Sequence, residues 1–286
     1  MSRFAFVNGA YQRMEQAHIG LEDRGFQFGD SIYEVIHFID DVYIDAEGHL
    51  ERLERSVSEL GMPLPMPRHI LLMHMGHLRK KNRIKEGFVY IQISRGEAPR
   101  NHLFPQNTLP TLVMIVKKQP FAPFEAKKVV TFPDIRWGRC DIKTTNLLPN
   151  VLVKQKAFEA GAFEGWMITL GGVISEGSLS NAWIVKEGSI YTAPTSCNIL
   201  GGITRRRLIA LADAAQIPVV EKSFTLGDAY GADEAFNSSS NAVVTPIVQI
   251  NDRLIGSGDP GPISRRLYDA YMDFVEQEVK RDSNFR

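Results

Sequence analysis

The chain has 286 residues, about twice the common domain length, so two domains or one large one are expected. Its hydrophobic fraction of 44% and charged fraction of 23% exclude the disordered and collagen-like classes. Lysine and arginine together number 33, as do aspartate and glutamate, so no net charge attracts nucleic acid or an anionic membrane. The composition therefore favours small-molecule ligands held by a local cluster of residues.

The cysteines and the hydropathy of the chain indicate the expected cellular location. Cys140 and Cys197 give no disulfide framework, and their spacing does not resemble a zinc site, so no metal is expected. A reducing cytosol fits this usage, and we expect a cytoplasmic location. The longest apolar runs, such as 112–116, are far below the ~20 residues of a membrane span. The N-terminal segment has no sustained apolar run either, so neither export nor membrane insertion is expected.

The first part of the chain is predicted to form strands and helices in a mixed order. Residues 31–45 are rich in Ile, Val, Phe and Tyr and are interrupted at Asp40-Asp41, which predicts a hairpin. Apolar residues at helical spacing, followed by the stop signals Gly61 and Pro63, predict a helix over 49–60. The remaining elements predicted here are a helix over 69–81 and strands over 88–94 and 111–117, which enclose the polar loop 95–107.

Two prolines in the segment QPFAPF mark an expected domain boundary. We predict a small N-terminal α/β domain over 1–118, a linker over 119–125 and a large C-terminal α/β domain over 126–286. The second domain mixes strands over 129–132, 165–170, 182–185 and 189–192 with helices over 148–160, 204–216 and 263–280. The expected fold class is α/β with mixed α+β character, without internal repeats.

One lysine lies at a junction suited to chemistry. In the segment RWGRCDIKTTNLLPN, Lys143 falls between a strand and a helix whose start is marked by Asn146 and Pro149. A lysine amine forms an imine only after it loses its proton, which burial or a neighbouring cation promotes, and Arg136 and Arg139 are candidate cations. On residue type alone, a solvated surface lysine is the commoner explanation.

Two other segments suit a charged ligand. Glu176 follows an apolar run and precedes Gly177, so its carboxylate is expected at the end of a strand, although an exposed turn glutamate is the usual alternative. The pair Gly201-Gly202 directly precedes a predicted helix, where free N–H groups and the helix dipole suit a phosphate. A cap formed by Thr204 beside a glycine turn is the alternative.

Several polar residues admit a simpler explanation. Arg100 and His102 lie in the loop 95–107, where a guanidinium can hold a carboxylate by two parallel hydrogen bonds, although the loop could simply be solvated. His74 and His77 are three apart on a predicted helix, but no acidic ligand accompanies them, which favours a plain helix face. The run 205–207 consists of three arginines, and its helical setting in a neutral chain favours solvation with local phosphate attraction over nucleic-acid binding.

Five segments, in order, resemble D-amino-acid transaminases. They are EDRGFQFGDSIYEV from Glu22, SRGEAPRNHLFP from Ser94, RCDIKTTNLL from Arg139, ISEGSLSN from Ile174 and GGITR from Gly201. These transaminases are class IV aminotransferases, which are pyridoxal 5'-phosphate (PLP) enzymes of fold type IV. The similarity runs from about Asn8 to the last predicted helix. It implies a two-domain fold with PLP between the domains and a homodimer in which each active site takes a loop from its partner.

The resemblance also implies roles for individual residues. Lys143 is then the lysine joined to PLP, and Glu176 keeps the pyridine nitrogen protonated, which makes the ring an electron sink. The phosphate contacts implied are Arg52, Ile203, Thr204 and Ser240. The trap for the substrate α-carboxylate is implied to be Tyr33, Arg100 and His102. For Arg52, an exposed position on an amphipathic helix remains the alternative.

The implied reaction converts D-alanine and 2-oxoglutarate into pyruvate and D-glutamate. Branched-chain L-aminotransferases and aminodeoxychorismate lyases of the same fold type share Lys143 and Glu176, but they are not expected to carry the Arg100-x-His102 pair. From a different class, a non-catalytic protein could bind a phosphorylated small molecule through the loop at Gly201. Ser31, where glycine is frequent, and Asn237 depart from the family pattern, which affects the expected substrate preference more than the chemistry.

Overall fold

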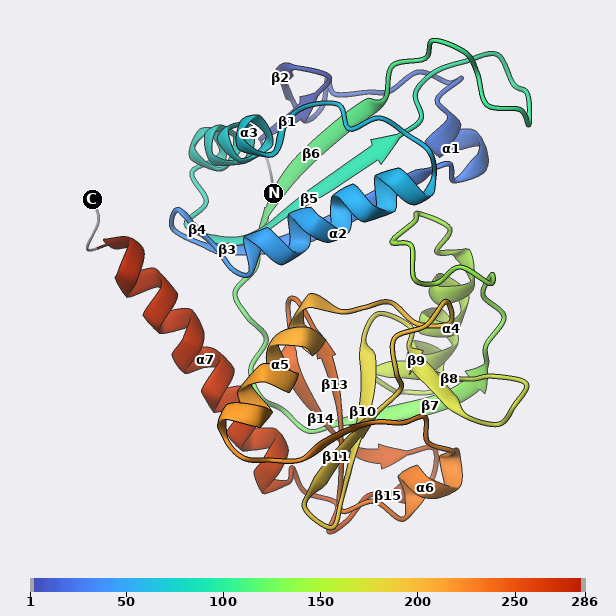
Figure 1. Cartoon of the computed structure of the whole chain (residues 1–286), viewed down its shortest axis with the longest axis vertical. Helices are drawn as coiled ribbons and strands as arrows, with labels where there is room; N and C mark the ends of the chain where they lie inside the picture. The colour runs from blue at the N-terminus through green and yellow to red at the C-terminus, as the bar shows by residue number, and fades with distance from the viewer. Residues whose placement is uncertain (1–2, 284–286) are drawn as a thin grey trace. The chain divides into compact units, whose positions relative to one another are not determined.

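The computed structural model describes residues 3–283, which divide into two compact units (Figure 1). The first unit comprises 3–120, Ile142–Asn146 and the end of the last helix from Glu278. The second comprises Phe121–Asp141 and Leu147–Gln277. The short segment that carries Lys143 thus belongs to the first unit, whereas the sequence predicts one continuous C-terminal domain over 126–286.

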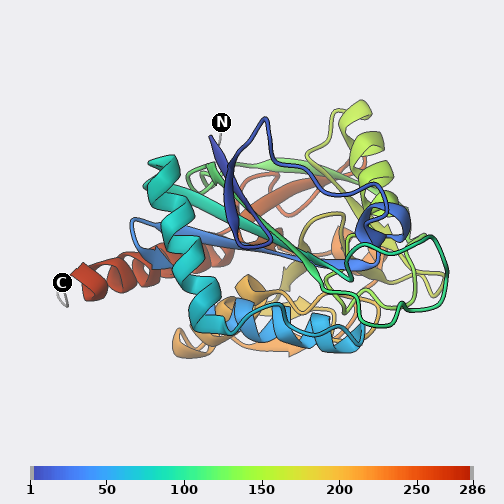
Figure 2. The same ribbon diagram turned by 90° about the horizontal axis from the view of Figure 1, so that it is seen from above.

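The first unit is built on a six-stranded antiparallel sheet with the order β2-β1-β6-β5-β3-β4. Its strands are β1 (Phe4–Val7), β2 (Ala10–Arg13), β3 (Ser31–Ile39), β4 (Val42–Tyr43), β5 (Glu86–Ser94) and β6 (Thr111–Lys118). Its helices are α1 (Arg24–Phe28), α2 (Ala46–Glu59) and α3 (Arg68–Asn82). Helices α2 and α3 cover one face of this sheet (Figures 1 and 2), where Leu53 and Met75 join alternate strand residues in one core.

Tight turns in this unit follow from residues that tolerate positive φ. The predicted hairpin at Asp40-Asp41 is confirmed, with Asp40 at φ 50°. Asn8 and Gly9, at φ 44° and 92°, form the two-residue turn between β1 and β2. The sequence does not predict this second hairpin, because its strands have only four residues each and carry little periodic signal.

The second unit contains a nine-stranded mixed sheet with the order β12-β11-β10-β13-β14-β7-β8-β9, and β15 pairs with β14. Its strands are β7 (Lys127–Pro133), β8 (Glu164–Ile168), β9 (Ile174–Gly177), β10 (Asn181–Lys186), β11 (Ser189–Thr192), β12 (Val219–Glu221), β13 (Glu234–Ser239), β14 (Val243–Ile250) and β15 (Arg253–Leu254). Its helices are α4 (Leu148–Glu159), α5 (Ile203–Ala214), α6 (Leu226–Tyr230) and α7 (Pro262–Ser283). Although β9 ends the sheet, it also contacts β10, so the sheet curls back on itself.

The predicted helices and strands of this unit are present, and their ends differ from the predicted ones by at most three residues. The sequence does not predict strands β13 and β14, although both are central in the sheet. Pro246 interrupts the apolar pattern of β14 and cannot donate a ladder hydrogen bond, which usually argues against a central strand. The sheet accommodates it beside an irregularity in register between Ile247 and Gln249.

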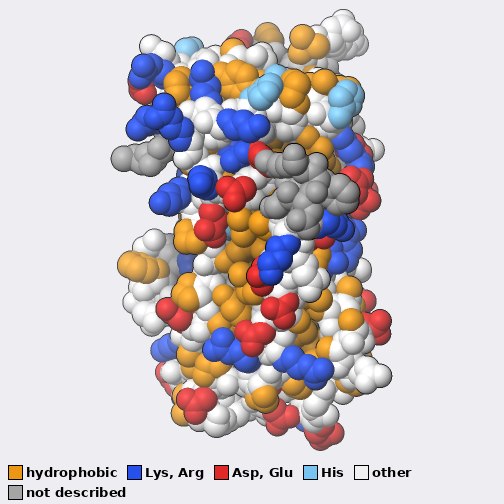
Figure 3. Space-filling model, turned by 90° about the vertical axis from the view of Figure 1, so that its left-hand side faces the viewer, with side chains coloured by type: hydrophobic (Ala, Val, Ile, Leu, Met, Phe, Trp, Pro, Cys, Tyr) orange, Lys and Arg blue, Asp and Glu red, His pale blue; other side chains and the backbone are white. Residues whose placement is uncertain are grey.

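On the face drawn in Figure 3, lysine and arginine side chains gather in the upper left, whereas basic and acidic side chains are interspersed in the lower half. Within residues 3–283, no helix combines the length and apolarity needed to cross a bilayer. The three-arginine run is not simply solvated, which corrects the sequence interpretation. Arg205 is 4% exposed, and its Nη2 donates to the Ala193 carbonyl at 2.9 Å and to Glu221 at 2.6 Å.

Candidate functional site

The predicted site residues divide between the two units. The first unit contains Tyr33, Arg52, Arg100, His102 and Lys143. The second contains Glu176, Ile203, Thr204 and Ser240.

The backbone around Lys143 is fixed by hydrogen bonds to the edge of β3. The Tyr33 N–H donates to the Lys143 carbonyl at 2.9 Å, and the Thr145 N–H donates to the Ser31 carbonyl at 3.0 Å. The Lys143 Nζ lies 4.1 Å from the centre of the Tyr33 ring. Helix α4 begins at Leu148, so the predicted junction before a helix is confirmed. The strand edge therefore places a half-buried lysine against an aromatic ring of the predicted carboxylate trap.

Ser31, the departure from the usual glycine, adds side-chain contacts to this attachment. Its Oγ lies 2.5 Å from Thr145 Oγ1 and accepts a hydrogen bond from Gln92 Nε2 at 3.4 Å. Gln92 in turn accepts from the Tyr90 hydroxyl at 2.7 Å, and the Tyr90 ring stacks on Tyr33 at 5.6 Å between centroids. The serine thus links the lysine segment to the strand that supports Tyr33.

Arg52 is buried on α2, which excludes the exposed position considered from sequence. It is 9% exposed, and its Nε and Nη2 donate to the two Glu34 carboxylate oxygens at 2.6 and 2.9 Å. His49 Nδ1 lies 2.8 Å from Glu34 Oε2. Burial alone would raise the pKa of Glu34, but Arg52 and His49 hold that pKa far below its ordinary value. Burial lowers the pKa of His49 and so favours its neutral form, and the negative charge of Glu34 is therefore balanced mainly by Arg52.

Arg100 and His102 are exposed and contact α1 rather than Tyr33. The Arg100 guanidinium lies 4.7 Å from the centre of the Phe28 ring, and the His102 and Phe28 ring centroids are 5.5 Å apart. Within residues 3–283, no hydrogen bond, ion pair or ring contact joins either residue to Tyr33. A single chain therefore does not assemble the predicted carboxylate trap.

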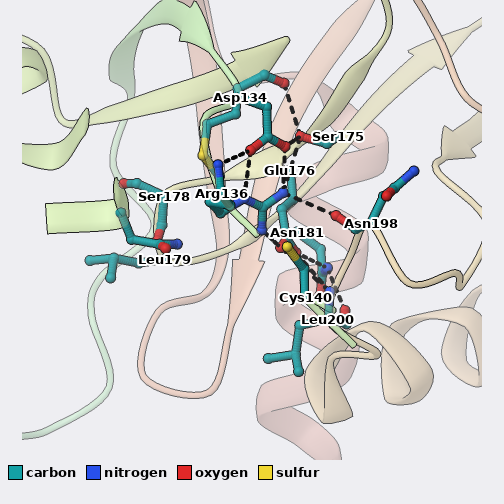
Figure 4. Close-up of polar contacts among 12 residues, drawn as sticks. Asp134, Arg136, Cys140, Ser175, Glu176, Ser178, Leu179, Asn181, Asn198 and Leu200 are labelled. Atoms are coloured by element: carbon teal, nitrogen blue, oxygen red, sulfur yellow. Dashed lines mark hydrogen bonds and ion pairs between the residues drawn. The ribbon is translucent and has the colours of Figure 1, made fainter. Parts of the chain in front are cut away.

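Glu176 lies at the centre of the polar network in Figure 4, at the end of β9. It is 6% exposed, pairs with Arg136 and accepts hydrogen bonds from Asn181 Nδ2 at 3.2 Å and the Leu200 N–H at 3.2 Å. The exposed turn considered from sequence is therefore wrong. Burial raises the pKa of Glu176 to about 7, against the lowering effect of Arg136.

Arg136 organises the loops around Glu176. Its Nη2 donates to Asp134 at 2.7 Å and to the Asn198 carbonyl at 3.0 Å. Burial alone would raise the pKa of Asp134, but hydrogen bonds from Arg136 and Ser175 lower it. Arg136 and Arg139 were candidate cations beside Lys143, but each is paired with a carboxylate, and Arg139 binds Asp141 at 3.0 Å. Sequence reasoning missed this role because the partners of Arg136 come from separate strands and loops.

The start of α5 has the open N–H groups that an anion requires. Gly202 is the N-cap and no side chain caps this end. The buried Ile203 and Thr204 have no acceptor for their N–H groups among the described residues. Thr204 lies inside the helix, so the alternative that it caps the helix is wrong. A Cβ at Gly202 would clash with Asn181 Oδ1, which requires glycine next to the Glu176 network.

Close to the end of β9 lies a second buried carboxylate that sequence reasoning also missed. Glu164 accepts hydrogen bonds from the Leu179 N–H at 2.5 Å and from Asn237 Nδ2 at 2.7 Å. Asn237 also accepts from the Trp166 indole at 2.7 Å. Asn237, which departs from the family pattern, is therefore buried between the side chains of Glu164 and Trp166. Ser240 lies half-buried in the turn after β13.

Comparisons with known proteins identify the family of this chain. A profile of the family "Amino-transferase class IV" matches residues 31–250, so the chain belongs to the class IV aminotransferases. It is similar to the D-alanine aminotransferase of Staphylococcus haemolyticus, at 38% identity over 95% of this chain and 97% of that protein. The Bacillus licheniformis D-alanine aminotransferase is 35% identical over 96% of this chain and 98% of that one.

Solved structures show the same fold. The Escherichia coli branched-chain amino acid aminotransferase superposes with a TM-score of 0.89 and 24% identity, covering 96% of this chain and 94% of that one. Another branched-chain amino acid aminotransferase, complexed with N-(5'-phosphopyridoxyl)-L-glutamate, gives a TM-score of 0.88 and 25% identity, covering 97% of this chain and 95% of that one. The predicted two-domain fold type IV architecture is confirmed.

The buried Glu34 carboxylate predicts a pH-dependent stability. Because its pKa is depressed in the folded state, its contribution is present above its ordinary pKa of 4.5 and is lost as the pH falls. Glu34→Gln should lose about 3–5 kcal/mol of unfolding free energy at neutral pH, because Arg52 loses its counter-charge. Its unfolding free energy should also fall less steeply than that of the wild type below about pH 4.5.

Urea denaturation across this pH range measures both effects. Glu51→Gln, an exposed change on the same helix, is the matched control and should stay within about 0.5 kcal/mol of the wild type. An acid-induced loss in Glu34→Gln as steep as in the wild type would assign the pH dependence to other carboxylates.

Proposed function

We propose that this aminotransferase transfers the amino group of D-alanine or a similar small D-amino acid to a 2-oxo acid such as 2-oxoglutarate, with PLP as its cofactor. The products are pyruvate and D-glutamate. The observation that carries the proposal is the buried carboxylate of Glu176, which Arg136, Asn181 and the Leu200 N–H hold in one direction, as a partner for a pyridine nitrogen requires. The D-alanine aminotransferases that match nearly the whole chain support the choice of substrate.

The described residues fit PLP in both units. The uncapped N-terminus of α5 offers the N–H groups of Ile203 and Thr204 to a phosphate, and Arg52 and Ser240 complete the proposed phosphate contacts. Lys143 would hold the cofactor covalently as a Schiff base. When bound, PLP supplies an aldehyde carbon that takes the amino group and a ring that withdraws electrons from the substrate Cα.

The residues of the chain then orient the substrate and move its proton. The Lys143 Nζ takes the proton from the substrate Cα, and its backbone is held in place by β3. Glu176 holds a proton at the pyridine nitrogen, while Asn181 and the Leu200 N–H fix the direction of its carboxylate. Tyr33 and the Arg100-x-His102 pair bind the α-carboxylate and thereby select the hand of the substrate.

We propose a cytoplasmic homodimer in which the partner's loop completes this trap. In one chain, Arg100 and His102 are exposed and do not contact Tyr33. The same loop exposes Leu103 and Phe104, at 75% and 64%, which suits burial against a second copy. Branched-chain aminotransferases and aminodeoxychorismate lyases share the fold but are not expected to have this Arg-x-His pair, so the pair favours D-amino acids over those alternatives.

One prediction concerns Lys143→Ala. It should abolish transamination, because the amine that anchors the cofactor and carries the proton is lost, whereas the phosphate contacts still bind PLP. Steady-state assays and the PLP content of the dialysed protein measure the two properties. Lys80→Ala, an exposed change on α3, should keep full activity. Activity in Lys143→Ala above a few per cent of the wild type would assign the role to another lysine.

Glu176→Gln should retain PLP but slow proton removal by on the order of 100-fold, since a neutral amide does not hold the pyridinium proton as a carboxylate does. Stopped-flow absorbance after mixing with D-alanine measures this step. Glu159→Gln, exposed on α4, is the control. An unchanged rate in Glu176→Gln would remove this residue from the mechanism.

A further prediction tests the preference for one enantiomer. Arg100→Ala with His102→Ala should keep its PLP content but lower kcat/KM for D-alanine by about 30- to 1,000-fold, the equivalent of about 2–4 kcal/mol. Values for D- and L-alanine are compared in the wild type, the double variant and the exposed control Arg13→Ala. A D-alanine value in the double variant equal to that of the wild type, or a wild type that prefers L-alanine, contradicts the D-specific function.

A further inference from the structure

The two cysteines lie side by side in the second unit, although they are far apart in the sequence. The Cys140 N–H donates to the Cys197 carbonyl at 2.7 Å. With standard bond lengths, this hydrogen bond keeps the two Cα atoms within about 6.6 Å of each other. Disulfide-bonded cysteines have Cα separations of roughly 4.4–6.8 Å. The two backbones are therefore already within the range that a disulfide requires.

We propose that Cys140 and Cys197 form a reversible oxidation site, at which hydrogen peroxide converts the two thiols into an intrachain disulfide. Both cysteines are free thiols in the structure, and the sequence contains no other cysteine that could compete. Two cysteines make no structural framework in a reducing compartment, but disulfides that form there are typically transient and redox-sensing.

The two thiols have unequal surroundings, which assigns their order of reaction. Cys197 is exposed, and its Sγ lies 3.8 Å from Asn198 Oδ1. Cys140 is half-buried, and its Sγ donates to the Trp137 carbonyl at 3.1 Å. Burial raises the pKa of the Cys140 thiol to about 11. Peroxide therefore reaches Cys197 first, and Cys140 acts as the resolving thiol after its side chain turns away from Trp137.

The chemistry balances with peroxide as the oxidant. The Cys197 sulfur takes one oxygen from hydrogen peroxide, which gives a sulfenic acid and one water. The Cys140 sulfur then attacks the Cys197 sulfur, so the S–S bond forms while the S–O bond breaks. The hydroxide leaves as a second water with the proton of the Cys140 thiol. The two thiols lose two electrons and two protons in total, and the peroxide is reduced to water.

This site connects to the Glu176 network through both of its loops. Asn198, next to Cys197, accepts a hydrogen bond from Arg136 through its carbonyl, and the Leu200 N–H donates to Glu176. Cys140 lies in the same loop as Arg136. Disulfide formation should therefore move Arg136 and the Leu200 N–H, the two groups that hold the Glu176 carboxylate. Its effect on the cofactor rests on the proposed function of Glu176 at the pyridine nitrogen.

The test treats the purified holoenzyme with hydrogen peroxide, blocks the remaining thiols and digests the protein without reduction. Mass spectrometry should find the peptides of Cys140 and Cys197 joined and two hydrogen atoms lighter, and dithiothreitol should separate them. In the control Cys197→Ser, Cys140 should remain an alkylatable thiol. A wild-type protein in which Cys197 becomes sulfinic acid while Cys140 stays alkylatable, or one that links only separate chains, overturns the proposal.

The absorption spectrum of the bound cofactor tests the connection to Glu176. It should change on peroxide treatment of the wild type, return with dithiothreitol and stay constant in Cys197→Ser. A complete disulfide with an unchanged spectrum overturns this connection. Peptide masses do not depend on PLP, so a failure of the proposed function remains distinguishable from a failure of the disulfide.

Discussion

The ion pair between Arg136 and Glu176 is the interaction on which the second unit's polar network depends. Burying a carboxylate costs free energy unless charges and hydrogen bonds compensate it. Glu176 pairs with Arg136 and accepts hydrogen bonds from Asn181 and the Leu200 N–H. These partners come from the loop after β7, from β10 and from the segment before α5. One carboxylate therefore fixes three segments, and the open N-terminus of α5 follows directly from one of them.

The first unit meets the same constraint with a different set of residues. Glu34 is fully buried, and its two oxygens are satisfied by Arg52 and His49 of α2. The cost of burying the Glu34 carboxylate is offset by the Arg52 guanidinium, whose charge does not change with pH in the ordinary range. Around Glu176, by contrast, burial outweighs Arg136 and leaves the pKa near neutrality. The first arrangement suits rigid support, and the second suits a group that exchanges or shares a proton.

Local sequence signals predicted the helices, including the start of α4 shortly after Lys143, because caps, prolines and apolar spacing act over a few residues. They did not predict the partners of Arg136 and Arg205, since Glu176 and Glu221 lie on strands far along the chain. Strand β14 was not predicted because Pro246, which has no N–H to donate, argues against a central strand, although β14 is central in the sheet. The roles of Arg100 and His102 came only from the family resemblance, because their exposed positions in one chain carry no geometric signal of a site.

The attachment of Ile142–Asn146 to β3 limits how this chain can be divided. The polypeptide begins in the first unit, leaves it near Phe121, returns for the five residues Ile142–Asn146, leaves again and returns with the end of α7 from Glu278. A gene fragment ending at residue 120 would therefore encode a sheet whose β3 edge lacks the partners of Tyr33 and Ser31. Unpaired strand edges of this kind promote aggregation, so the first unit cannot be separated from the segment Ile142–Asn146 without loss. In a chimera of two related proteins, β3 and the segment Ile142–Asn146 should therefore come from the same parent.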